Sequence, residues 1–240
     1  MTPEMLLALG IVAFYWVDSA LYLSVNEAVV NTRCDALRGL SFGSALELAG
    51  RRPYTPNPFT PFWPAFRIEW DMTNLSVRGS VEIAEEMRRH LRNARGVSLL
   101  SGACAIFIII GAPTALVLGN GFLFLGAVAL GFLSAICSCV VIALKKTELG
   151  LNSRQVLSLA LVALACLPCS ANLSRAVASR RTWTLAARDL LDFGLASAES
   201  DRIRDPFREA LVRARRLHSE DSIEFKVIDD ELKRIGERAS

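Results

Sequence analysis

The sequence predicts an all-α integral membrane protein with about four transmembrane helices, a polar loop domain and a charged helical tail. Three observations lead to this fold class. The chain has 240 residues, of which 52% are hydrophobic. Charged residues make up 21%, yet none lies between Gly96 and Leu144. That uncharged run of 49 residues is about twice what one membrane-spanning helix requires.

The first apolar stretch runs from Met5 to Val25 and is interrupted only by Asp18. It lacks the basic start and the small-residue cleavage pattern of a signal peptide. We therefore expect a retained transmembrane helix within residues 1–25.

The uncharged run predicts two more transmembrane helices, over residues 97–118 and 121–144. Residues 119–121, Gly-Asn-Gly, form a turn signal, so the two helices should pack as an antiparallel hairpin. Pro113 removes a backbone hydrogen bond within the first of them, which predicts a kink near Ile109.

Small residues recur at every fourth position of the helix expected over 121–144: Ala127, Gly131 and Ala135. Such a face allows two helices to approach closely, and we interpret it as packing inside the bundle.

The fourth apolar stretch, residues 155–174, contains no charge but includes Pro168. Either it crosses the membrane and completes the membrane region 96–176, or it enters and returns on the same side.

The polar loop domain covers residues 26–95, with a proline and aromatic segment at 53–70. Five prolines within twelve residues exclude a helix or a central strand in that segment. A helix is predicted over 80–95, because Ser80 can cap it and Ile83, Met87 and Leu91 form an apolar stripe.

The charged tail, residues 177–240, should be helical. We expect a helix over 182–198, with Trp183 as an anchor at the membrane interface. Asp205 followed by Pro206 predicts the start of a second helix.

The last segment of the tail, which begins near Ile223, has two interpretations. Ile223, Phe225 and Val227 alternate as in a strand, whereas acidic residues fill the opposite face of a helix. We favour the helix.

Basic residues close to the ends of the spans predict the orientation. They are more numerous beside the 26–95 loop and the Lys145–Arg154 loop than beside the start of the tail. The 26–95 loop is therefore expected in the cytoplasm. A conflict arises at Arg180 and Arg181, and it disappears if the fourth stretch is re-entrant.

Asp18 is the candidate functional residue within the membrane, because a carboxylate there costs roughly 2.5–3.5 kcal/mol. It could contact a proton or a cation, bond to serines or backbone across the bundle, or lie near the membrane surface.

The proline and aromatic segment is the candidate site for a protein partner, since its proline spacings match ligands of aromatic grooves. The favoured interpretation, however, is an irregular lid that lies on the membrane surface or packs on the protein's own helices. The candidate docking residues are Pro56, Pro58, Phe59, Pro61, Phe62 and Trp63.

Four cysteines, in a Cys-x-Cys and a Cys-x-x-Cys pair, are weak candidates for a soft metal or for redox chemistry. The simpler interpretation is that they are small apolar residues at helix contacts, so no metal is expected. These residues are Cys137, Cys139, Cys166 and Cys169.

No enzyme motif is present among those sought, which predicts a non-enzymatic protein without a cofactor. We interpret the chain as a multi-pass interaction or scaffold protein, or an accessory subunit. Its expected partners are the lipid bilayer and a protein in the membrane or at its cytoplasmic face. Nucleic acid is not expected, because no basic patch is interleaved with aromatic residues.

The balance of 23 Arg against 4 Lys suggests a GC-rich bacterium, and hence the plasma membrane of such a cell, the inner membrane. Two alternatives remain at this stage. One is an immunity-type or regulatory protein that blocks a membrane-acting toxin or channel, and the other is a metal-binding or redox membrane protein that uses its cysteines.

Overall fold

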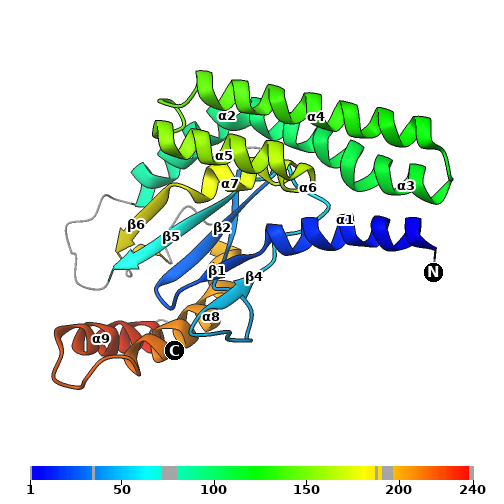
Figure 1. Cartoon of the computed structure of the whole chain (residues 1–240). Helices are drawn as coiled ribbons and strands as arrows, with labels where there is room; N and C mark the ends of the chain where they lie inside the picture. Colours follow the sequence, from blue (N-terminus) through cyan, green and yellow to red (C-terminus); the bar gives the residue numbers. More distant parts are fainter. Residues whose placement is uncertain (1, 34–35, 72–79, 187–188, 191–196, 238–240) are drawn as a thin grey trace. The chain divides into compact units, whose positions relative to one another are not determined.

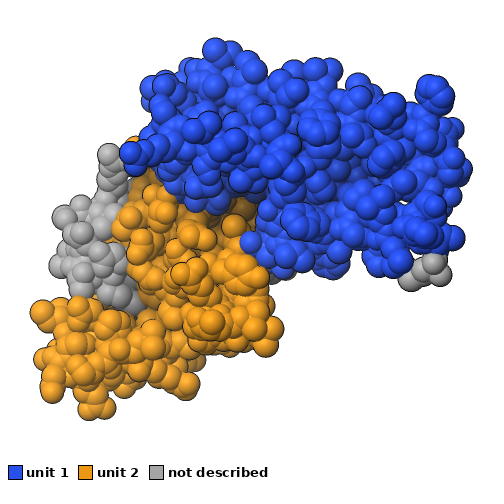
Figure 2. Space-filling view, in the orientation of Figure 1, with its two compact units in different colours: residues 1–20, 55–64, 89–181 blue, residues 21–54, 65–88, 182–240 orange. Residues whose placement is uncertain are grey.

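A computed structural model (Figure 1) describes residues 2–33, 36–71, 80–186, 189–190 and 197–237. The chain divides into two compact units, which Figure 2 colours separately. Unit 1 comprises residues 1–20, 55–64 and 89–181. Unit 2 comprises residues 21–54, 65–88 and 182–240.

The fold is mixed α/β, so the predicted all-α class with four transmembrane helices is wrong. Unit 2 contains a four-stranded sheet in the order β3-β2-β5-β6, in which β6 is parallel to β5 and the other pairs are antiparallel. Its strands are β2 (Glu27–Arg33), β3 (Ala36–Ser41), β5 (Ala65–Asp71) and β6 (Thr182–Ala186).

Strand β5 shows why the polar loop domain is not helical. Phe66, Ile68 and Trp70 are buried, whereas Arg67 and Glu69 between them are half-buried. This alternation with a period of two is typical of a strand in which one face meets the core.

Strand β6 replaces the first part of the helix predicted over 182–198, of which residues 187–188 and 191–196 lie outside the described residues. The ring of Trp183 is buried and meets that of Phe66 edge to face, with 6.2 Å between the ring centroids. Trp183 is therefore a core residue of unit 2, and its predicted role as an interfacial anchor is wrong.

Two helices and a second, two-stranded sheet complete unit 2. The second sheet pairs β1 (Leu21–Leu23) with β4 (Arg52–Tyr54). The helices are α8 (Ser197–Arg215) and α9 (Ile223–Glu237). The predicted final helix is thus confirmed, but Pro206 lies inside α8 and does not mark its start.

Phe207 attaches α8 to the sheet. Its ring is fully buried and lies 5.7 Å from that of Trp70 and 5.8 Å from that of Phe42. Aromatic pairs at these distances add to the stabilisation from burial.

Unit 1 contains the predicted helical hairpin. Its first arm is α2 (Ser80–Ala105), which belongs to unit 1 from Arg89 onward, continued by the π-helix η1 (Ile106–Gly111) and α3 (Ala112–Val117). The second arm is α4 (Gly121–Leu144), and the side chain of Asn120 caps it by accepting from the backbone of Leu123. The chain is thus helical over both ranges predicted from the uncharged run, with a turn between them.

Helix α2 begins at Ser80, as predicted for the 80–95 segment. Ile83, Met87 and Leu91, the predicted apolar stripe, are all buried.

A kink was predicted near Ile109, and at this place the structure has the π-helix η1. Pro113 has no N–H for the carbonyl of Ile109, and its ring would clash with that carbonyl in a regular helix. The wider turn relieves the crowding, and Ala112 donates to the carbonyl of Phe107.

The small-residue face of α4 packs inside unit 1, as predicted. Ala127, Gly131 and Ala135 are buried. A Cβ atom added to Gly131 would lie 2.3 Å from Cδ1 of Ile108, so only glycine fits at this helix contact.

The first and fourth apolar stretches differ from their predicted spans. Helix α1 (Pro3–Ser19) ends where β1 begins. The fourth stretch breaks at Cys166 into α5 (Ser153–Ala165), α6 (Leu167–Ser170) and α7 (Leu173–Ser179).

Two helices among the described residues are long and apolar enough to cross a membrane, Val81–Val117 and Gly121–Leu144. Helix α5 has 13 residues and a length of about 20 Å, which is short of the roughly 30 Å of a bilayer core. Pro168 and the polar side chains after Ala165 stop it from extending.

Candidate functional site

A partly buried polar network joins three separate parts of unit 1. These are the end of α1, the loop 55–64 and the start of α7. Buried polar groups must be hydrogen-bonded to be tolerated, so the network fixes all three segments in one arrangement.

Asp18 lies in the last turn of α1 and receives a hydrogen bond from Asn172, with 3.0 Å between Nδ2 and Oδ2. The same Nδ2 donates to the carbonyl of Tyr15 at 3.1 Å. Asn172 is the residue that precedes α7, so the break in the fourth apolar stretch brings its amide to α1. Asp18 is therefore bonded to an amide side chain from a distant segment, and not to the serines or backbone that the sequence suggested as partners.

Arg175 is the cation of this network. Its side chain is buried, and Nη1 donates to Oδ1 of Asn172 at 3.2 Å. One amide group thus lies between the carboxylate of Asp18 and the guanidinium of Arg175. The sequence-based search found no basic partner for Asp18, because Arg175 lies beyond the stretch taken as the fourth span.

The loop 55–64 is held down by main-chain acceptors. Nη2 of Arg175 donates to the carbonyls of Asn57 at 2.6 Å and Thr60 at 2.8 Å. The hydroxyl of Tyr15 donates to the carbonyl of Pro58 at 2.5 Å. This matches the predicted lid that packs on the protein's own helices.

The six candidate docking residues differ in how exposed their side chains are. Pro56 and Pro61 are buried, and Phe62 packs on Gly102, where an added Cβ would lie 3.4 Å from the ring. By contrast, Phe59 is 87% exposed on a loop whose carbonyls are fixed on both sides of it. Pro58 and Trp63 are half-buried.

Serines extend the polar contacts along α7. The backbone N–H of Ser174 donates to Oγ of Ser101, and the Oγ atoms of Ser174 and Ser98 lie 2.8 Å apart. Ser170 donates to the carbonyl of Ala163 at 2.6 Å. Serine hydroxyl groups thus form hydrogen bonds with backbone groups that the broken helix leaves unpaired.

The four candidate cysteines are not brought together as one site. Cys166 and Cys169 form a disulfide at the break between α5 and α6, so neither is available as a thiolate ligand. Cys137 and Cys139 on α4 are free and half-buried. Within the described ranges, no group of three or more His, Cys, Asp or Glu side chains is placed to hold a metal.

Cys104 on α2 lies close to the disulfide. Its Sγ is 3.9 Å from the carbonyl oxygen of Leu167, the residue after Cys166.

These features define the class of protein. One chain combines a helical unit that contains an apolar hairpin with a second unit of mixed α/β structure. Comparison with protein-family models, with curated proteins and with solved structures finds no match to this chain.

Proposed function

We propose that this chain is a non-enzymatic membrane-anchored interaction protein or accessory subunit, held in the bilayer by the hairpin of α2–α3 and α4. The observation that carries the proposal is the outward surface of that hairpin. Large apolar side chains are exposed along it without one charge over 49 residues, and Phe122 is 91% exposed. Water would leave such a surface unstable, whereas lipid stabilises it.

The two ends of the hairpin differ in a way that supports an orientation. Arg92 and Arg95 precede the apolar part of the first arm, and Lys145 and Lys146 follow the second. Residues 118–121 at the tip carry no charge. Basic residues remain in the cytoplasm, so the base of the hairpin lies there and the tip crosses.

A cytoplasmic base places the loop 26–95 on the cytoplasmic side, because it leads directly into α2. Helix α5 is too short to cross, so the tail after Arg175 returns to the same side. This arrangement removes the conflict that Arg180 and Arg181 create in a four-span protein.

Phe59 is the candidate contact for the partner. An aromatic side chain that projects from a fixed loop loses little conformational freedom on binding, which favours a role as an anchor. Its partner is a protein in the membrane or at the cytoplasmic face.

Two sets of variants test the proposal in intact cells. In a chain whose native cysteines are serine, a membrane-impermeant maleimide should label Asn120→Cys at the tip but not Thr147→Cys at the base. A photoreactive residue at Phe59 should form a discrete adduct that the same residue at exposed Thr55 does not form. Labelling of Thr147→Cys alone would overturn the orientation, and equal or absent adducts at both loop positions would overturn the docking role.

The disulfide favours a second candidate, a redox membrane protein. Cys166 and Cys169 can alternate between disulfide and dithiol, with two electrons and two protons exchanged. The serine variants Cys166→Ser and Cys169→Ser should then abolish the phenotype of the protein, whereas Cys137→Ser should not. Wild-type behaviour of all three would remove this candidate.

A further inference from the structure

A small cavity lies inside unit 2, away from the polar network of unit 1. Its volume is about 220 Å³, and it is bounded by β4, by the segment between β3 and β4, and by the second half of α8. Three arginines line it, Arg52, Arg213 and Arg216, together with one carboxylate, Glu47. Phe42 is among the apolar side chains that form the rest of the wall.

Arg52 is the central observation. Its side chain is 8% exposed, and Nη1 donates to the carbonyl of Phe42 at 2.9 Å. Its Nε is buried without a hydrogen-bond partner, and no ion pair to Arg52 occurs in the described part of the chain. Glu47 and Glu209 act on Arg52 through their charge but form no ion pair with it, so its buried guanidinium lacks a directly bonded anion among the described residues. Such a group is costly to bury, which indicates that an anion completes the site.

The backbone at Gly43 lies close to Arg52. Gly43 has φ +82°, and a Cβ atom there would lie 2.9 Å from Cβ of Arg52. Burial lowers the pKa of Arg52, and the neighbouring charge of Arg213 adds to this effect. The guanidinium is therefore held in a poorly solvated place beside a second cation.

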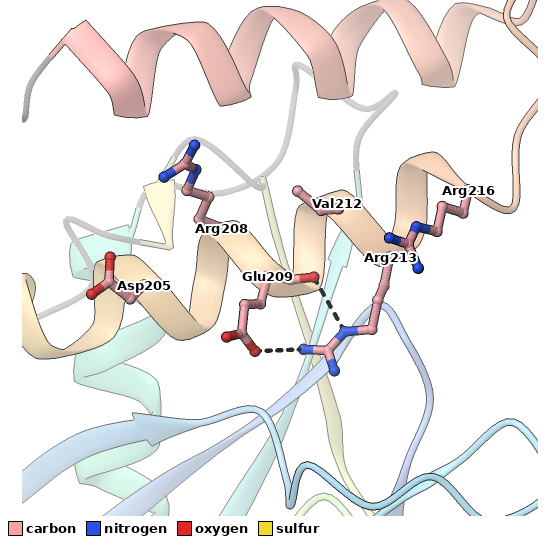
Figure 3. Close-up of a pocket in the computed structure, with 6 residues that line it drawn as sticks. All are labelled: Asp205, Arg208, Glu209, Val212, Arg213 and Arg216. Atoms are coloured by element: carbon pink, nitrogen blue, oxygen red, sulfur yellow. Dashed lines mark hydrogen bonds and ion pairs between the residues drawn. The ribbon is translucent and has the colours of Figure 1, made fainter.

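The charge of the wall is positive. Three arginines and Glu47 give a net charge of +2 for the titratable groups that line the cavity. Arg213 donates to Glu209, one turn earlier on α8, with 3.4 Å between Nη2 and Oε2 (Figure 3). Even with Glu209 included, the sum is +1.

We propose that this cavity binds the phosphate group of a small phosphate monoester. A phosphate monoester carries about −1.5 to −2 charges near pH 7, which fits the charge of the wall. Guanidinium groups bind phosphate with paired, charge-assisted hydrogen bonds. The apolar wall at Phe42 accommodates the carbon atoms next to the phosphate. The phosphate can come from a soluble metabolite or from the headgroup of a lipid such as phosphatidic acid.

Binding of glycerol 3-phosphate to the full chain in detergent tests the proposal by titration calorimetry. Saturable binding is expected at millimolar ligand or below. The variant Arg216→Gln should raise the Kd by about tenfold or more, because it removes a charged donor. Arg208→Gln is the matched control, since Arg208 is an exposed arginine of the same helix that lines the outer hollow of Figure 3 and not the cavity. It should change the Kd less than twofold.

A second arm distinguishes the two sources of phosphate. Nanodiscs of phosphatidylcholine with phosphatidic acid should displace glycerol 3-phosphate if the ligand is a lipid headgroup, and should leave it bound if the ligand is soluble. Either result supports the phosphate site. Absence of saturable binding, or equal losses in Arg216→Gln and Arg208→Gln, would overturn it. Because the assay uses purified protein, its failure would leave the membrane anchor and the Phe59 contact standing.

Discussion

The amide of Asn172 donates to the carboxylate of Asp18 at 3.0 Å, although the two residues are 154 positions apart in the chain. The opposite end of the same amide accepts from Arg175. A neutral side chain therefore bonds to both an acid and a base.

This relationship predicts unequal effects of two substitutions. Asp18→Asn keeps an acceptor for Nδ2 of Asn172, so the free energy of unfolding should change by less than about 1 kcal/mol. Asn172→Leu removes both bonds and leaves the buried guanidinium of Arg175 and the exposed carboxylate of Asp18 each without this partner, so a loss of about 1–3 kcal/mol is expected. Thermal unfolding in detergent measures both. Similar melting temperatures for Asn172→Leu and the wild type would show that the network does not hold unit 1 together.

Two glycines of α4 should respond in opposite directions to alanine. At Gly131 the new methyl group would meet Ile108 at 2.3 Å, so Gly131→Ala should lower the melting temperature. At Gly126 nothing lies within 4 Å, and Gly126→Ala should be neutral or stabilise by up to about 1 kcal/mol through helix propensity.

The companion change Ile108→Ala provides the control for Gly131. It should destabilise alone, yet cost less in the Gly131→Ala background, because it clears the space that the methyl group needs. If the losses of stability in the two single variants simply add in the double variant, the effect of Gly131→Ala does not come from a clash with Ile108.

The disulfide predicts a specific pattern of alkylation. Reduction of the denatured chain before alkylation should add two modified cysteines, measured by mass spectrometry, because Cys166 and Cys169 are bonded to each other. In Cys166→Ser the same reduction should add none. An unchanged count in the wild type would mean that both cysteines are thiols.

His90 predicts a loss of stability in acid. It lies in the charged part of α2, before the uncharged run, and burial together with the charge of Arg181 lowers its pKa from 6.5 to about 4. The unfolded chain then binds the proton more readily, so stability falls as the pH drops below 6.5. The loss should reach roughly 2 kcal/mol at pH 5.

His90→Gln isolates this effect. Melting temperatures between pH 7 and pH 5 should fall less steeply in the variant than in the wild type. Parallel curves would show that His90 is not kept neutral by the fold.

The parts of the fold that the sequence predicted correctly depend on local patterns. The uncharged run, the Gly-Asn-Gly turn and the small face at Gly131 define the hairpin without knowledge of any distant contact. Pro113 marks the irregular turn in the same way, because its effect acts four residues upstream.

The sheet was missed because its signals are short and its partners are distant. The alternation from Phe66 to Trp70 follows directly on five prolines, which draw attention to a loop. Strand β6 pairs with β5 from more than 100 residues away, and nothing in its own five residues identifies that partner. The buried position of Trp183 follows from this pairing.

The candidate site was predicted in part. Asp18 and the proline and aromatic loop were identified, because a carboxylate in an apolar stretch and clustered prolines are visible in the sequence. Asn172 and Arg175 were not assigned to them. Their role depends on the break at Cys166, which turns α7 toward α1.

The most direct test of the account is extraction of membranes from cells that express the full chain. Alkaline carbonate removes proteins bound to the membrane surface and leaves those whose helices lie in the hydrocarbon core. We expect the chain to stay in the membrane pellet and to enter solution only with detergent. Recovery of the chain in the carbonate supernatant, monodisperse in plain buffer, would contradict the membrane hairpin.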